Sequence, residues 1–203
     1  WWTHDYTMAL MRLRSPWSNN VPERMIADFG DASAGAIDAD PIDLTIAPAN
    51  FNGALGKPGS IVIADRGSDG DTYNAVYYFD PASTETDVTG YINFLVAPTP
   101  GDLGAGNLNA IASLPKSGEV VTLSQDGFLT AIDGDGALRA IWPQNLWSDL
   151  SGPTPAGSAL AVDPTTGRIW VAEDYLNEIW SIEPVSAGPA ADQQGRDLRQ
   201  FRP

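Results

Sequence analysis

The sequence predicts an all-β chain in which short antiparallel strands are joined by tight turns. Gly (20 residues) and Pro (16 residues) are both frequent among the 203 residues, which favours many short elements over a few long helices. Hydrophobic residues make up 43% of the chain, and there are seven Trp, six Tyr and six Phe, so we expect a packed core. Apolar runs rich in Val, Ile and aromatic residues alternate with Pro and Gly turns, which is typical of β-hairpins.

The clearest structural unit lies near the C-terminal end, over residues 158–184. A first strand is predicted over 159–162, followed by a turn over 163–167 that contains Pro164 and Gly167. A second strand is predicted over 168–172 and a third over 178–182. This unit therefore reads as three consecutive antiparallel strands.

The same order of strands and turns recurs upstream, over 43–81 and 109–134, and part of it over 1–13. The last residue predicted for each second strand marks the copies, at Thr3, Ala64, Leu123 and Ala172, with spacings of 61, 59 and 49 residues. Fourth, outer strands are predicted over 23–29, 88–96, 138–142 and 198–201. Repeats of this length with three or four strands each predict β-propeller blades, over roughly 1–40, 41–100, 101–150 and 151–203.

The number of predicted blades does not suit a closed ring. The chain begins inside a second strand and ends near a fourth, whereas closed propellers of this type usually need about six blades or more. The chain also starts with Trp1-Trp2 rather than Met, so we expect a processed, trimmed or partial chain. Three arrangements stay open: part of a longer protein, two copies that pair to close a ring, or an unusually small four-bladed ring.

Two phrases of this repeat resemble those of a known superfamily. DPTTGRIWVAEDYLNEIWSIEP and PGSIVIADRG…NAVYYFDP resemble the blades of NHL-repeat and SMP-30/gluconolactonase-like propellers. The resemblance implies a propeller fold, and in the SMP-30-like hydrolases a divalent metal held by acid and amide side chains in the channel. Asn109, in Asn-Ala-Ile-Ala, is similar to that family's Asn-Gly-Leu-Ala phrase, whereas Ile42 and Ser158 stand at the corresponding positions of the other copies.

Carboxylates follow the predicted second strands, at the edge where propellers usually bind ligands. Carboxylate and amide oxygens are the ligands that Ca²⁺ prefers, which makes a calcium site one hypothesis. Its candidate ligands are Asp43, Asp65, Asn109, Glu173 and Asp174. The alternative is that these residues satisfy local backbone N–H groups in turns. Two Asp/Gly-rich stretches, 65–71 and 133–136, superficially resemble calcium loops, but the second is better explained as a hairpin turn.

Tryptophans supply a second candidate site. Trp142 and Trp147 flank Asn145 in a connection between predicted blades, where they suit the binding of carbohydrate or of a protein partner. Trp170 and Trp180 instead occupy apolar positions within strands, so we expect them in the core between blades.

Charge and composition exclude several classes of function. The net charge of −15, with only two Lys, argues against binding of nucleic acid or anionic lipid. No apolar run is long enough for a transmembrane helix. The chain has no Cys, which excludes disulfides and thiolate metal sites, and its only histidine, His4, lies near the chain start.

The sequence therefore supports two main hypotheses. The first is a binding or assembly module of a secreted, cell-surface or periplasmic protein, non-catalytic by itself, whose partner is the rest of a larger propeller or a second copy. The second is a calcium-dependent SMP-30/gluconolactonase-like hydrolase. A quinone-dependent sugar dehydrogenase on the same fold is a distant third.

Overall fold

The structure is a computed structural model that describes eleven segments of the chain. These are residues 2–4, 9–12, 23–26, 41–66, 74–80, 93–97, 102–104, 106–141, 157–173, 177–183 and 198–201. For the strands before residue 41, for Asn93 and for residues 198–201, the description covers the backbone alone. Within these segments every regular element is a β-strand, which confirms the all-β prediction.

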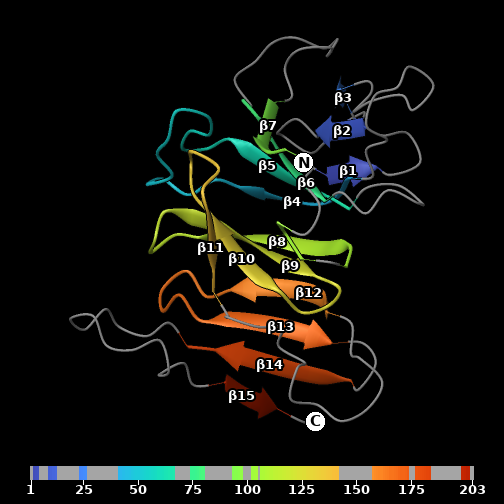
Figure 1. The fold of residues 1–203 in the computed structure, drawn as a ribbon. Coiled ribbons are helices and arrows are strands. Elements are labelled where there is room, and N and C mark those ends of the chain that lie inside the picture. Colours follow the sequence, from blue (N-terminus) through green and yellow to red (C-terminus); the bar gives the residue numbers. More distant parts are fainter. Residues whose placement is uncertain are drawn as a thin grey trace, which may run out of the picture.

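The described strands form four separate antiparallel sheets, none of which closes on itself (Figure 1). The first sheet contains β1 (Trp2–His4), β2 (Ala9–Arg12) and β3 (Glu23–Ile26). The second contains β4 (Pro41–Ile46), β5 (Ile61–Asp65), β6 (Ala75–Phe79) and β7 (Asn93–Val96). The third contains β8 (Leu108–Leu114), β9 (Glu119–Ser124), β10 (Leu129–Ile132) and β11 (Leu138–Ala140). The fourth contains β12 (Gly157–Val162), β13 (Ile169–Glu173), β14 (Glu178–Ile182) and β15 (Leu198–Phe201).

In each sheet the strands follow one another in chain order, as expected for the predicted repeat. The outer strands β3, β7 and β11 fall inside the predicted ranges, and β15 matches 198–201. One boundary was wrong: each second strand continues one residue further than predicted, to His4, Asp65, Ser124 and Glu173. The polar residues predicted to follow these strands are therefore their last residues.

The second, third and fourth sheets pack face to face, and their two contacts share several positions of the repeat. We call the face of a sheet that contacts the next sheet along the chain its forward face, and the opposite face its back face. One core joins the second and third sheets. It contains Val62, Ala64 and Val76 from the forward face of the second sheet and Leu108, Ile111, Val120 and Ile132 from the back face of the third. Between the third and fourth sheets, Val121, Leu123, Leu129 and Ala131 share a core with Ile169, Val171, Trp180 and Ile182. Trp180 is thus a core residue, as predicted, whereas the same prediction for Trp170 was wrong, because Trp170 is half-buried on the opposite face and lies outside both cores.

The first strands of neighbouring sheets lie side by side, β4 next to β8 and β8 next to β12 (Figure 1). The hydroxyl oxygens of Thr45 on β4 and Ser113 on β8 are 3.2 Å apart, and the Ser113 hydroxyl also donates to the carbonyl of Ile46. Between the third and fourth sheets, the N–H of Gly157 on β12 donates to the carbonyl of Gln125, which directly follows β9, at 3.3 Å. The first strands thus form a row that crosses three sheets.

The loop between β4 and β5 packs against the turn between β10 and β11. Both Leu55 and Gly56 donate their N–H groups to the carbonyl of Gly134, and the Ala54 N–H donates to the Asp135 carboxylate at 2.6 Å. At Gly53 the approach is so close that a Cβ atom would lie 2.0 Å from the carbonyl carbon of Gly134. A second set of contacts, away from the row of first strands, therefore joins the second and third sheets.

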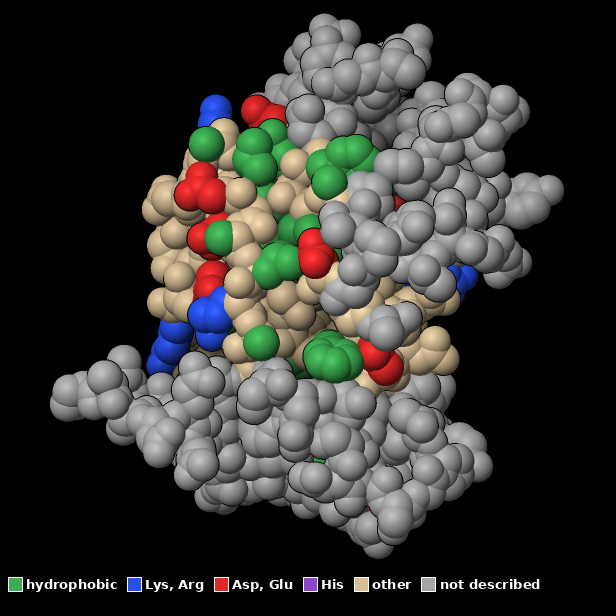
Figure 2. Space-filling model, viewed as in Figure 1, with side chains coloured by type: hydrophobic (Ala, Val, Ile, Leu, Met, Phe, Trp, Pro, Cys, Tyr) green, Lys and Arg blue, Asp and Glu red, His purple; other side chains and the backbone are tan. Residues whose placement is uncertain are grey.

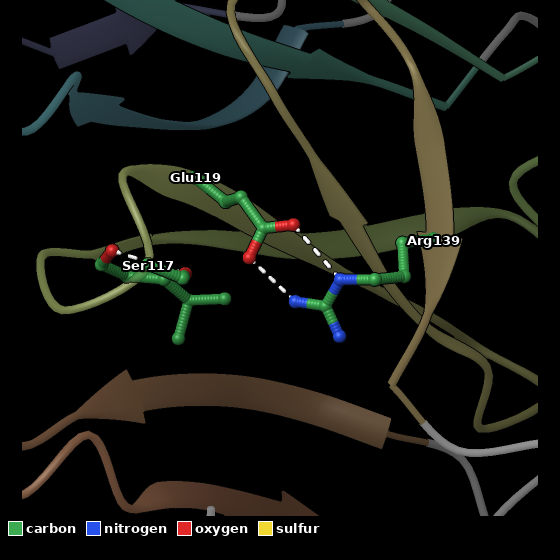
Figure 3. Close-up of polar contacts among 4 residues, drawn as sticks. Ser117, Glu119 and Arg139 are labelled. Atoms are coloured by element: carbon green, nitrogen blue, oxygen red, sulfur yellow. Dashed lines mark hydrogen bonds and ion pairs between the residues drawn. The ribbon is translucent and has the colours of Figure 1, made fainter. Parts of the chain in front are cut away.

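The stretch 133–136 is a hairpin turn, as the sequence predicted, because β10 pairs directly with β11 across it. The Asp133 carboxylate accepts the N–H groups of Asp135 and Ala137, both at 2.9 Å, and Gly136 has a φ of 80°, which favours glycine. The outer strand of this sheet is also held by two parallel hydrogen bonds from the Arg139 guanidinium to Glu119 (Figure 3). This surface pair contributes at most about 1 kcal/mol.

Candidate functional site

The last residues of β5, β9 and β13 are polar, buried and structurally equivalent. Asp65, Ser124 and Glu173 pair with the first residues of β4, β8 and β12, and their exposed fractions are 1%, 0% and 3%. They therefore lie within the stacked sheets rather than on a solvent-facing edge. Burying such groups costs free energy unless they form hydrogen bonds, so their partners decide what each residue does.

Asp65 interacts with Tyr77 on the neighbouring strand β6. The Tyr77 hydroxyl is hydrogen-bonded to the Asp65 carboxylate. Burial raises the pKa of Tyr77 above its ordinary value, and the negative charge of Asp65 raises it further. The Tyr77 ring stacks on Phe94 of β7, with ring centroids 5.0 Å apart. Asp65 thus holds a neutral tyrosine that acts as a hydrogen-bond donor within the second sheet.

Ser124 closes the turn between β9 and β10. Its hydroxyl donates to the Asp126 carboxylate at 2.5 Å and accepts the N–H of Phe128 at 3.0 Å. This arrangement agrees with the alternative that polar residues at the strand ends satisfy local turn groups. Asp163 also satisfies turn groups, before β13: its carboxylate accepts the N–H groups of Thr165 and Thr166.

In the fourth sheet, Glu173 lies directly opposite Glu178 of β14, and their exposed fractions are 3% and 4%. Glu178 was not among the candidate ligands predicted from the sequence. Its position could have been found from the strand period of two, because Glu178 shares a face of β14 with the buried residues Trp180 and Ile182. Two carboxylates are therefore brought together at this strand end, while the predicted ligand Asp174 lies outside the described residues.

The first strands share an irregularity that places Asn109. The register of β4, β8 and β12 shifts at equivalent points, so that Ile42, Asn109 and Ser158 are each an extra residue in a β-bulge. Bulges re-aim side chains, and the Asn109 amide reaches the next sheet, where it donates to the carbonyl of Gly157 at 2.6 Å. Asn109, whose sequence phrase is similar to that of a family metal ligand, therefore forms a contact between sheets.

Asp43 follows the bulge of β4 and reaches the third sheet. Its carboxylate accepts the N–H of Ile111 on β8 at 3.0 Å and its neighbour Leu44's N–H at 2.8 Å. Burial raises the pKa of Asp43 above its ordinary value, and the two N–H donors oppose that rise. Asp43 and Asn109 thus use the same end of neighbouring first strands to join three sheets.

Asn74, which the sequence analysis missed, forms the most buried polar link between sheets. It lies just before β6 with an exposed fraction of 3%. Its side-chain oxygen accepts the N–H of Leu108 at 2.8 Å, and its amide nitrogen donates to the carbonyl of Gly106 at 2.8 Å. One side chain therefore satisfies a donor at the start of β8 and an acceptor in the chain just before it.

The described carboxylates do not gather into a metal centre. Among the residues placed by the structure, no group of three or more His, Asp or Glu side chains is arranged to hold an ion. On the face seen in Figure 2, acidic side chains are spread along the described surface rather than clustered.

No helix in the described part is long and apolar enough to span a membrane. Four predicted site residues, Trp142, Asn145, Trp147 and Asp174, and most of the stretch 65–71 lie outside the described residues.

No protein-family model and no curated protein sequence matches this chain. The resemblance to NHL-repeat and SMP-30-like propellers consequently stays an expectation from the two sequence phrases.

The raised pKa of Asp43 predicts a pH-dependent contribution to stability. A carboxyl group with a higher pKa in the folded chain stabilises the fold when protonated, and this contribution is lost as the pH rises through the folded pKa. The wild-type chain should therefore lose stability relative to Asp43→Asn as the pH rises through that range. Urea unfolding of both proteins across the acidic range measures the difference.

Asp163→Asn is the matched control for this measurement. Hydrogen bonds from Thr166 and Thr165 lower the pKa of the exposed Asp163, so its contribution appears as the pH rises. The wild-type chain should therefore gain stability relative to Asp163→Asn over the acidic range. The same sign of pH dependence for both variants would contradict the environment described for Asp43.

Proposed function

We propose that this chain is a segment of a β-propeller that acts as a binding or assembly module and is non-catalytic by itself. The observation that carries the proposal is the repeated contact between consecutive four-stranded sheets, with their first strands side by side. In a propeller each blade is such a sheet, and its first strand lines the central channel. A row of first strands joined by Thr45–Ser113 and Asn109–Gly157 contacts is the arrangement that a propeller requires.

The hydrogen-bond partners of the candidate site residues support an assembly role over a catalytic one. Asp43 and Asn109 bind backbone groups of the next sheet, Ser124 binds its own turn, and Asp65 binds Tyr77. Catalytic acids, bases and metal ligands need groups that a substrate or ion can reach. We infer that Asp43 and Asn109 hold neighbouring blades together, whereas Ser124 and Asp65 each stabilise their own blade. Two further parts of the proposal rest on the sequence. They are location outside the cell or in the periplasm, and carbohydrate binding at Trp142, Asn145 and Trp147.

The effect of Ca²⁺ on stability distinguishes this proposal from the hydrolase hypothesis. A ligand that binds only the folded chain stabilises it by RT ln(1 + [Ca²⁺]/Kd), which is about 2.7 kcal/mol at a hundredfold excess over Kd. We expect thermal unfolding to be the same in CaCl₂ and in EDTA, and the chain to hydrolyse no sugar lactone in either. Stabilisation by Ca²⁺ that Asn109→Ala abolishes, together with lactone hydrolysis, would instead support the hydrolase.

A further inference from the structure

The loop between β4 and β5 contains the only Asn-Gly sequence of the chain, Asn52-Gly53. The Asn52 side chain is exposed, and its amide nitrogen donates to the nearby Asn50 carbonyl at 3.1 Å. The side-chain amide is therefore open to water. Because residue 53 has no side chain, its backbone nitrogen is less shielded than that of any other residue type. An exposed asparagine thus precedes an accessible backbone nitrogen.

The N–H of Gly53 differs from the three N–H groups that follow it. Those of Ala54, Leu55 and Gly56 donate to the turn between β10 and β11 at 2.6, 3.2 and 2.8 Å, and Figure 1 shows the loop beside this turn. Within the described part of the chain, the Gly53 N–H donates to no acceptor. Its nitrogen can therefore act as a nucleophile without first breaking a hydrogen bond.

We propose that Asn52 is a site of spontaneous deamidation, which releases the β4–β5 loop from the third sheet. The Gly53 N–H loses its proton to hydroxide, and the nitrogen attacks the carbonyl carbon of the Asn52 side chain. The new N–C bond closes a succinimide ring, and the bond to the side-chain amide nitrogen breaks, so that ammonia leaves. Water then opens the ring at either carbonyl, which gives aspartate or isoaspartate at position 52.

Isoaspartate lengthens the backbone at a contact that has no spare room. Its main chain runs through the former side chain and contains one additional methylene group. A Cβ atom on Gly53 would lie 2.0 Å from the Gly134 carbonyl carbon, and one on Gly134 would lie 2.6 Å from the Gly53 nitrogen. The longer backbone therefore displaces the loop, and the hydrogen bonds from residues 54–56 to the turn break with it.

Both products also place a new carboxylate beside an acidic turn. The turn contacted by the loop contains Asp133 and Asp135, and the Asp135 carboxylate accepts the Ala54 N–H. Like charges at short range repel each other, and this repulsion opposes the contact. It acts alone in the aspartate product and adds to the longer backbone in isoaspartate. We therefore expect Asn52→Asp to reproduce only part of the release.

The test begins with incubation of the folded full chain at mildly alkaline pH, with circular dichroism to show that it stays folded. Peptide mapping by mass spectrometry locates the converted asparagines, and a methyltransferase specific for isoaspartate distinguishes the two products. The comparison within the chain is Asn50, which is also exposed but precedes Phe51, whose N–H donates to the Pro48 carbonyl at 2.9 Å. We expect Asn52 to convert at least about tenfold faster than Asn50.

Hydrogen exchange measures the release of the loop. In the fresh chain the amides of Leu55 and Gly56 are bonded to the Gly134 carbonyl, so they should exchange slowly. In the incubated chain they should exchange at least about tenfold faster. Asn52→Gln is the matched control, because it keeps a side-chain amide while its longer side chain disfavours ring closure. This variant should keep slow exchange after the same incubation.

Conversion of Asn52 no faster than that of Asn50 in the folded chain, or conversion only in urea, overturns the proposal. So does conversion that leaves the exchange of Leu55 and Gly56 unchanged, since the loop is then not released. Equal acceleration of exchange in incubated Asn52→Gln also overturns it, because the release then has a cause other than deamidation.

Discussion

Replacing Asn74 by alanine should lower the free energy of unfolding by about 2 to 4 kcal/mol. The substitution removes the acceptor of the buried Leu108 N–H and the donor to the Gly106 carbonyl, both on the chain that enters β8. A buried donor left without a partner costs its full desolvation penalty, about 1 to 3 kcal/mol. Urea unfolding followed by circular dichroism measures the effect.

Asn52→Ala is the matched control, because Asn52 is exposed and its amide donates only to the nearby Asn50 carbonyl. Its effect should stay within about 0.5 kcal/mol. Asn74→Asp keeps the acceptor for Leu108 but replaces the donor to Gly106 by a carboxylate oxygen, so it should also destabilise the fold. Equal stability of Asn74→Ala and Asn52→Ala would contradict the inter-sheet role of Asn74.

Leu123→Ala should cost about 2 to 5 kcal/mol, the range for removing a buried leucine side chain from a tightly packed core. Leu123 is fully buried on the forward face of the third sheet. The β12 backbone lies so close that a Cβ atom on Gly157 would be 2.8 Å from a Leu123 methyl carbon. The cavity would therefore open between the third and fourth sheets, where both strands limit its collapse.

Leu138→Ala, on β11 of the same sheet, should cost less than about 1 kcal/mol because this side chain is 39% exposed. The two substitutions remove the same atoms, so their difference measures the buried packing of Leu123, which the fourth sheet shares. If Leu123→Ala were no more destabilising than Leu138→Ala, the third and fourth sheets would not be packed as described.

The strands were predictable because their signals are local. Runs such as 61–65 and 169–173 combine β-branched and aromatic residues, and Pro or Gly turns precede or follow them. The repeat then extended these assignments to weaker segments, so that β15 was found from its place in the fourth copy. The last residues of the second strands were missed because Asp, Ser and Glu disfavour strands on local grounds, while pairing with β4, β8 and β12 extends the strands.

The roles of the polar residues were harder to predict, because they depend on contacts between sheets. Asp43 and Asn109 were singled out as oxygen ligands, yet their described partners are backbone groups of the next sheet. Asn74 gave no signal, since nothing in its local sequence indicates that Leu108, 34 residues later, lies beside it. Only the packing of one sheet on the next brings such pairs together.

That stacking is tested most directly by a disulfide between neighbouring first strands. The chain has no Cys, so Thr45→Cys with Ser113→Cys introduces one defined pair, at hydroxyl positions 3.2 Å apart. Mild oxidation should form the bond within single chains and consume both thiols, whereas Thr45→Cys with Ser158→Cys, on β4 and β12, should keep both thiols free within the chain. Free thiols in the first pair, or a disulfide in the second, would contradict the row of neighbouring first strands.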